Sequence, residues 1–348
     1  MTTRPFIRPL VLLLLAASTV LHAANSQPIS LAGTWRFELD RADVGVNERW
    51  FNRALPDQLQ LPGSLQERGF GDEISTNTVW TGSLNERSWF TADRYAPYRQ
   101  PGNVKVPFWL QPEKSYVGVA WYQRDIDIPK SWQGRRLVVQ FERAHWGTTL
   151  WLDDQKIGSR DALGTPHEYD LGTAITPGRH QLTLRVDNRQ LIAVGADAHS
   201  ITDHTQGNWN GVAGRLELVA TDPLWFDQVR VFPNAAKRQI RVEAKLGNAT
   251  GQPGSGTLKA TTRSFNGRKT PSPAPLELPI QWSADGGQVN FTYELGPNAP
   301  LWDEFSPILH ELTLEIPGVI SPHRTTFGLR DVALVNQQIV LNQRPIFL

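Results

Sequence analysis

The chain has 348 residues, of which 40% are hydrophobic and 20% are charged, and its formal net charge is +1. This balance is typical of a globular protein of about two domains, and it excludes both a strongly basic nucleic-acid-binding surface and a long charged tail. The sequence contains no cysteine, which excludes disulfides and thiol catalysis.

The N-terminus has the pattern of a secretory signal. Arg4 and Arg8 form a charged region, an apolar run follows at Leu10–Ala17, and small residues for cleavage stand at Leu21–Ala24. The apolar run is too short to span a membrane comfortably. We therefore expect residues 1–24 to be removed and the protein to be secreted or periplasmic, without a membrane span after cleavage. A permanent N-terminal anchor is the alternative.

A long irregular insertion comes early in the mature chain, from Leu61 to Lys114. Loops of this length in compact domains are usually functional, and the Trp, Tyr, Asn and Arg content of this one suits a binding loop. The alternative is a surface insertion that packs on its own sandwich. Its acidic pair, Asp72–Glu73, is expected to be solvated charge.

The rest of the mature chain consists of short runs in which apolar and polar residues alternate. Such runs cover 135–144, 148–159 and 179–188, with turn signals between them. This period of two predicts an all-β fold built from sandwiches. The Asp153–Asp154 doublet lies in a predicted hairpin turn, where Asp is favoured for backbone reasons, so we expect no catalytic pair there.

A boundary between two modules is expected near Thr221–Pro223. Beyond it, alternating runs at 238–246, 256–264, 288–295 and 310–316 form a second β module. Its length, roughly one hundred residues, suits an immunoglobulin-like sandwich. The Pro/Ser-rich stretch Thr270–Pro279 is expected to be a loop.

The 13 Trp residues, against 6 Tyr, are the most unusual feature of the composition. Trp offers a large flat apolar face, which suits both sandwich cores and the surfaces on which sugar rings stack. We expect most of them in cores and roughly two or three in contact with a ligand.

Several stretches resemble the N-terminal half of glycoside hydrolase family 2, the group of β-galactosidases, β-glucuronidases and β-mannosidases. In chain order they are GTWRFELD (33–40), LPGSLQERG (61–69), YVGVAWYQRDIDIP (116–129), FERAHWGTTLWLDDQKIGS (141–159), LTLRVDN (182–188), NWNGVAGRLEL (208–218), PLWDEFSPILHELTLEI (300–316) and FGLRDVALVNQQIVLNQRPIFL (327–348). The resemblance covers Ile29–Leu348. One departure is Gln343, where the family prefers Gly in a tight hairpin turn, because Gly tolerates positive φ.

The resemblance implies an order of domains. Residues 1–24 are the signal peptide, 25–221 a jelly-roll (galactose-binding-like) sugar-binding sandwich, 222–330 an immunoglobulin-like β-sandwich, and 331–348 the first strands of a truncated TIM barrel. It implies a secreted enzyme that hydrolyses terminal β-glycosidic O-linkages in oligo- or polysaccharides, with no cofactor. Both catalytic Glu residues of the family lie in the barrel, and no position here matches either motif. We therefore predict no catalytic residue and no activity for this chain alone, and a chain that was cut short either by a gene-model or contig end or by a premature stop.

The stretch Ala196–Gly211 is the best candidate for a binding loop, because it is rich in groups that bind hydroxyls or stack on sugar faces. The resemblance points to Asp203 and Asn103 as sugar ligands; the alternative is that they cap loops. The full predicted substrate-binding set is Asp203, Asn103, His204, Asn208 and Trp209.

Two histidine patterns have plainer interpretations. His199 and His204 have no third partner in a known metal pattern, so we predict hydrogen bonding and no metal site. His145 is expected either to face the concave side of the jelly roll or to cap its strand.

Two other functions compete with the enzyme fragment. A non-catalytic carbohydrate-binding protein would hold sugar on the jelly roll alone. A structural or adhesive protein of two sandwiches would show no dependence on saccharides. The expected partner is an oligo- or polysaccharide and not a nucleic acid; the sequence specifies neither the sugar nor the oligomeric state.

Overall fold

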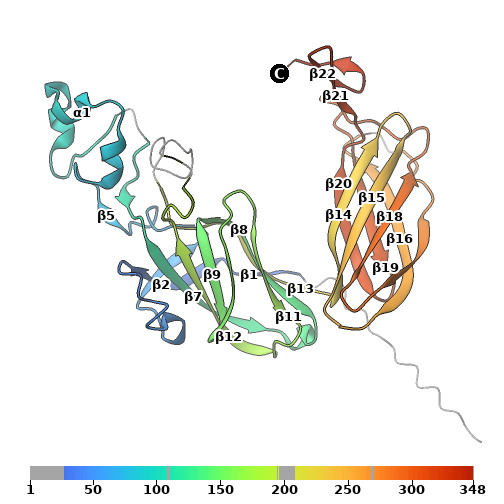
Figure 1. Cartoon of the computed structure of the whole chain (residues 1–348), viewed down its shortest axis with the longest axis horizontal. Coiled ribbons are helices and arrows are strands. Elements are labelled where there is room, and N and C mark those ends of the chain that lie inside the picture. Colours follow the sequence, from blue (N-terminus) through green and yellow to red (C-terminus); the bar gives the residue numbers. More distant parts are fainter. Residues whose placement is uncertain (1–26, 108–109, 194, 196–207, 268–269, 348) are drawn as a thin grey trace, which may run out of the picture.

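The alternating runs of the first half form two antiparallel sheets that pack against each other (Figure 1). The computed structural model describes residues 27–107, 110–193, 195, 208–267 and 270–347. One sheet has the order β1 (Ile29–Ser30), β13 (Gly211–Thr221), β8 (Arg136–His145) and β11 (His167–Gly172), with β4 (Gly63–Ser64) also paired to β13. The other has the order β10 (Gln155–Arg160), β9 (Gly147–Leu152), β12 (Gly178–Asp187), β7 (Val119–Ile128), β2 (Gly33–Asp40) and β3 (Asp57–Leu61).

The core between these sheets explains the period of two in the sequence. Phe141 and Leu218 from one sheet meet Tyr122 and Leu184 from the other, and all four side chains are fully buried. Successive strand residues point to opposite faces, so the alternate apolar positions of each run reach this core together. The all-β prediction is confirmed for the residues that the structure describes.

The outer face of the second sheet is covered by the chain itself. Trp121 and Trp151 project from β7 and β9 and pack against Trp50 and Phe51, which belong to the segment 41–56 around η1 (Trp50–Asn52). The rings of Phe51 and Trp151 stack with centroids 5.2 Å apart. These tryptophans therefore serve packing, as do most of the described ones: the buried set is Trp35, Trp50, Trp80, Trp89, Trp121, Trp132, Trp146 and Trp151.

The insertion forms a small unit at one end of these sheets (Figure 1). Its elements are β5 (Asp72–Glu73), η2 (Val79–Ser83), α1 (Ser88–Thr91), η3 (Asp93–Arg99) and β6 (Lys114–Ser115), and η4 (Lys130–Trp132) follows β7. Trp80, Leu84, Trp89 and Val106 are buried together as its own core. Across the described ranges, no helix has the length and apolarity needed to cross a membrane.

The second half of the chain forms another pair of sheets. One has the order β14 (Leu224–Asn234), β15 (Gln239–Asn248) and β18 (Gly287–Glu294), and the other β17 (Leu276–Trp282), β16 (Gly254–Phe265), β19 (Leu309–Ile316) and β20 (Ile320–Phe327). The predicted loop Thr270–Pro279 is wrong in its second half, since Leu276 already begins β17. Leu276 and Leu278 pack against the core, and Pro279 is tolerated because β17 is an edge strand.

The last described residues form a small antiparallel sheet of β21 (Val332–Val335), β22 (Gln338–Leu341) and β23 (Arg344–Pro345). Its two connections are both Asn-Gln turns. Asn342 and Gln343 have φ angles of 49° and 69°, and Asn336 and Gln337 have φ angles of 49° and 65°. The expected tight turn with positive φ at Gln343 is confirmed.

Polar contacts join the two pairs of sheets. The Asp222 carboxylate lies 3.5 Å from the Arg135 guanidinium and accepts a hydrogen bond of 2.7 Å from the Ser321 amide. The Arg136 guanidinium lies 3.9 Å from the centre of the Trp225 ring. Arg135 and Arg136, at the start of β8, therefore contact Asp222 and Trp225, which lie between the two pairs of sheets and at the start of the second pair.

Candidate functional site

Two long excursions leave the first pair of sheets at the same end. One is the insertion, which follows β4 and returns at β7; the other follows β12 and returns at β13. Asp187 pairs with Val119, and Gly211 pairs with both Ser64 and His145, so the ends of both excursions are neighbours. The described cavities at this end of the molecule lie between and beside these excursions.

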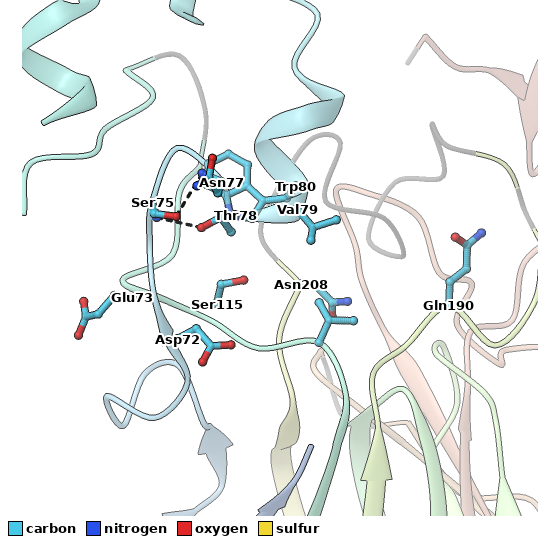
Figure 2. Close-up of a pocket in the computed structure, with 11 residues that line it drawn as sticks. Asp72, Glu73, Ser75, Asn77, Thr78, Val79, Trp80, Ser115, Gln190 and Asn208 are labelled. Carbon is cyan, nitrogen blue, oxygen red and sulfur yellow. Dashed lines mark hydrogen bonds between the residues drawn. The ribbon is translucent and has the colours of Figure 1, made fainter. Parts of the chain in front are cut away.

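The first cavity has a volume of about 650 Å³ and is shown in Figure 2. Residues from 72 to 80 of the insertion form one wall, and Ser115, Val117, Gln190 and Asn208 complete the lining. These side chains carry hydroxyl, amide and carboxylate groups, with Val79, Val117 and Trp80 as apolar surface. Such a mixture suits a polyhydroxylated ligand, which needs many hydrogen-bond partners and some apolar contact.

The wall of residues 72–80 is fixed by short-range contacts. β5 pairs with β6, and the Ser75 amide donates to Thr78 Oγ1 over 2.9 Å, as drawn in Figure 2. Asp72 forms an ion pair of 2.8 Å with Arg41, and Glu73 forms one with Lys114. The acidic pair is exposed, as expected, but each carboxylate has a cationic partner and the pair lies in a short strand.

The second cavity, of about 640 Å³, lies on the other side of Asn208. Its lining consists of Ser64, Gln66, Glu67, residues 110–113, Asn208 and Trp209. His145 packs against one face of the Trp209 ring, with centroids 4.9 Å apart, and its Nδ1 lies 2.8 Å from the Trp209 carbonyl oxygen. Trp209 is therefore a half-buried indole, supported on one face, in the lining of a cavity of mixed polar and apolar character. His145 is the last residue of β8, so these contacts lie at the end of its strand.

The structure brings two of the predicted binding residues together. Asn208 lines both cavities and Trp209 lines the second. Asn103 lines neither; its Nδ2 donates to the Pro97 carbonyl oxygen over 2.8 Å, which is the loop-capping alternative. Asp203 and His204, and with them His199, lie outside the described residues.

None of the pKa shifts found among the described carboxyl groups has the direction that a glycosidase acid needs. A general acid of that class needs a raised pKa. Where the pKa of a described carboxyl departs from its ordinary value, it is lowered, because hydrogen bonds and nearby cations together outweigh the opposing effect of desolvation. The groups are Asp43, Glu86, Asp125, Glu142, Asp227, Glu304 and Glu311. No group of three or more His, Asp or Glu that could hold a metal ion is found in the described part of the chain.

Sequence reasoning missed the buried amides beneath the cavities. Gln66, Asn188 and Asn210 are at most 5% exposed and hydrogen-bond one another or their neighbours' backbones. A signal was present, because Asn188 ends one alternating run and Asn210 immediately precedes the next. Its meaning depended on knowing that these ends meet in space.

Comparison with known proteins finds a family match for most strands of the first pair of sheets. Residues 88–222 match the family model described as "Glycosyl hydrolases family 2, sugar binding domain". The β-galactosidase large subunit of Leuconostoc lactis is 24% identical over 327 residues, covering 89% of this chain and 47% of that protein. The β-glucuronidase of Paenibacillus borealis is 23% identical over 159 residues, covering 45% of this chain and 20% of that protein.

Solved structures give the same result for the fold. The β-glucuronidase of Ruminococcus gnavus in complex with D-glucaro-d-lactam has a TM-score of 0.63 at 17% identity, over 92% of this chain and 48% of that one. The chain thus spans about half the length of relatives that match most of it. The predicted resemblance to the N-terminal portion of glycoside hydrolase family 2 is confirmed.

Proposed function

We propose that this chain, which matches a family 2 sugar binding domain, is the non-catalytic N-terminal region of a glycosidase. The proposed enzyme is secreted or periplasmic and hydrolyses terminal β-glycosidic bonds. The observation that carries this proposal is a pair of cavities, lined by both polar and apolar side chains, that meet at Asn208, with Trp209 in the lining of the second. Hydroxyl-binding amides beside a half-buried indole are the groups that recognise a saccharide.

The domain assignment is part of the proposal. Residues 25–221 are proposed as the jelly-roll sugar-binding domain, 222–330 as the immunoglobulin-like domain, and 331–348 as the start of a catalytic barrel. Two separate buried cores, one on each side of residues 221–224, support the first division. The proposed signal peptide, 1–24, lies outside the described residues, so its support is the sequence pattern alone.

The proposed role of this region is binding and not bond cleavage. Retaining hydrolysis needs two carboxyl groups about 5 Å apart, one of them with a raised pKa. The carboxyls of the described residues favour the ionised form wherever their pKa is shifted, and Asp72 and Glu73 are paired with cations. We therefore propose that the chain alone is inactive, and that β-galactosides or β-glucuronides, named by its relatives, are its saccharide classes.

Calorimetric titration of the full chain with p-nitrophenyl β-D-galactoside and p-nitrophenyl β-D-glucuronide tests the binding role. We expect saturable binding of at least one, and no release of nitrophenol. Turnover that disappears on mutation of a carboxylate within this chain would contradict the non-catalytic assignment. Absence of binding across a wide glycan array would contradict the saccharide assignment and favour a structural role.

A free-standing carbohydrate-binding protein is the second candidate, because the described residues by themselves form two cavities beside Trp209 and hydroxyl-binding amides. It predicts the same binding. The two candidates differ in the coding DNA beyond codon 348: an open frame with two Glu motifs on barrel strands supports the glycosidase, and an immediate natural stop supports the binding protein.

A further inference from the structure

Four chain segments meet beneath the two cavities. They are residues 64–66, 116–118, 186–188 and 208–210, the beginnings and ends of the two excursions. Side-chain amides, and not sheet pairing alone, join these segments to one another. We call Gln66, Asn188, Asn208 and Asn210 the amide network.

Asn210 lies at the centre of the amide network and is fully buried. Its Nδ2 lies 3.2 Å from the carbonyl oxygens of both Gly118 and Val186, and its Oδ1 accepts a 2.7 Å hydrogen bond from the Tyr122 hydroxyl. Its backbone amide donates to Gln66 Oε1 over 3.2 Å. One side chain thus ties the return of the second excursion to the end of the first and to the sheet core.

Asn188 performs the matching role where the second excursion begins. Its Oδ1 accepts from the Gly118 amide over 2.8 Å, and its Nδ2 donates to the Tyr116 carbonyl oxygen over 2.7 Å. It also bonds reciprocally with Asn208: Asn188 Nδ2 donates to Asn208 Oδ1, and Asn208 Nδ2 donates to the Asn188 carbonyl oxygen. Asn188 therefore fixes the orientation of the residue that lines both cavities.

Gln66 closes the network from the start of the insertion. Its Nε2 lies 3.3 Å from the carbonyl oxygens of Tyr116 and Asn208. Every segment end is consequently bonded to at least one other through a buried amide, and a buried polar group left without its partner is costly. The described ends of the two excursions are therefore held in fixed positions relative to one another.

Asn188 and Asn210 line neither cavity, so they have no direct contact with a ligand held there. We infer that Asn188 and Asn210 are positioning residues of the saccharide site: they lock the ends of both excursions together and so set the distance between the cavity walls. This inference rests on the proposed function for the ligand, while its geometric part can be tested without one.

Isosteric substitutions provide the test. Asn188→Asp and Asn210→Asp keep the shape of the side chain but replace an amide donor by a carboxylate oxygen facing backbone carbonyls, which repel it. Val139→Ala is the control, because Val139 lies in the sandwich core, six residues along β8 from His145. It lowers the stability of the same domain without touching the excursion ends.

The absence of cysteine from the sequence allows site-specific spin labels. Labels at Val79→Cys and Gln190→Cys, both exposed on the lining of the first cavity, report the wall-to-wall distance by electron paramagnetic resonance. We expect one narrow distance distribution for the labelled chain and for Val139→Ala, and a broad one for Asn188→Asp and Asn210→Asp. In the unlabelled variants, affinity for the bound nitrophenyl glycoside should fall about tenfold, as expected for loss of a bond or two.

Three outcomes decide the inference. An unchanged distance distribution in both Asn→Asp variants overturns it. A broadened distribution with unchanged affinity overturns the link to the site and leaves a role in folding only. If the parent chain binds neither glycoside, the proposed function fails. The distances between the labels still decide whether Asn188 and Asn210 fix the separation of the cavity walls.

A milder variant covers the case in which Asn210→Asp does not fold. Tyr122→Phe removes only the hydroxyl that donates to Asn210 Oδ1, and the ring keeps its packing in the core. It should broaden the distance distribution less and weaken binding by about threefold. No change in either measurement would count against the inference.

Discussion

The outer face of the second sheet and the cavity end of the same domain are both rich in aromatic residues, but only one is open. At the sheet face, Trp121 and Trp151 are at most 4% exposed, because the segment 41–56 lies over them. At the cavity end, Trp209 is supported on one face by His145 and lines a cavity of about 640 Å³. Aromatic content alone therefore does not locate a binding site. The two regions differ in whether another segment of the chain packs over the aromatic rings and buries them.

The segment 41–56, which we call the cover, is held in place by hydrogen bonds to buried side chains. Gln123 donates from its Nε2 to the carbonyl oxygens of Trp50 and Arg53, and Asp40 accepts from the amides of Val44 and Gly45. Buried, bonded polar groups of this kind make a segment expensive to displace. The sheet face is thus a packing surface, and the predictions below test its contrast with the cavity end.

Trp151→Ala should have the largest effect on stability. Trp151 stacks on Phe51 and packs against Trp121 with ring centroids 5.0 Å apart. Removing a buried Trp leaves a cavity and should lower the free energy of unfolding by about 4 kcal/mol. Urea unfolding measures this loss, and saccharide affinity at low temperature should be unchanged. A loss of affinity without a loss of stability would mean that the sheet face, and not the cavity end, binds the ligand.

Asp40→Ala should loosen the cover without removing an aromatic ring. The Asp40 carboxylate is buried and accepts hydrogen bonds of 2.8 Å from two backbone amides and of 3.0 Å from Trp121 Nε1. Leaving these donors without an acceptor should cost about 2 kcal/mol. Acrylamide quenching of Trp fluorescence should increase as the cover opens. Unchanged quenching and unchanged stability would show that Asp40 is not needed to hold the segment.

The strands and one turn could be predicted from the sequence because their causes are local. Alternation gives the buried face of each strand, and the Asn342–Gln343 turn follows from the resemblance to a family that has Gly at position 343 in a tight hairpin. Leu276–Pro279 was misjudged because the Pro/Ser-rich composition that precedes it hid an edge strand that packs on the core. Local patterns fail where burial by a distant segment decides the structure.

The candidate site could be predicted only in part for the same reason. Asn208 and Trp209 stood out by residue type, and they do lie at the cavities. Asn188 and Asn210 did not, because an asparagine at a strand end is commonly a turn residue. Their importance comes from the meeting of four segments that lie far apart in the sequence, up to 144 positions for Gln66 and Asn210.

Trp209→Ala should lower saccharide affinity with little effect on stability, whereas Trp151→Ala should lower stability and leave affinity unchanged. The Trp209 side chain is half-buried and packs on His145, so its loss should have a small effect on unfolding. If its free face carries a sugar ring, affinity for the bound nitrophenyl glycoside should fall about tenfold, the scale of one aromatic contact. Calorimetric titration measures the change. Trp209→Phe, which keeps a flat ring, should recover part of the affinity, and equal losses in both variants would contradict stacking.

Asp125→Asn should give the smallest effect, and one that depends on pH. Asp125 lies beyond the cover on the same sheet face, where it pairs with Arg36 at 3.0 Å and with Arg179 at 2.7 Å. The hydrogen bond from Arg36 is the main cause that lowers the pKa of the Asp125 carboxyl to about 2. Because this folded-state pKa lies below the unfolded value, the ion pair stabilises the protein fully above pH of about 4 and is lost as the pH falls towards 2.

At pH 7 we expect Asp125→Asn to lower the free energy of unfolding by about 1 kcal/mol, a value reduced from the full linkage because the side chain is 28% exposed. Near pH 2 the variant and the parent should be equally stable. Asp127→Asn, at an exposed position of the same strand, is the control and should change little. A loss of stability that is as large at low pH as at pH 7 would mean that Asp125 acts through packing, as the covered tryptophans do. The uncovered part of this sheet face would then be stabilised in the same way as the covered part.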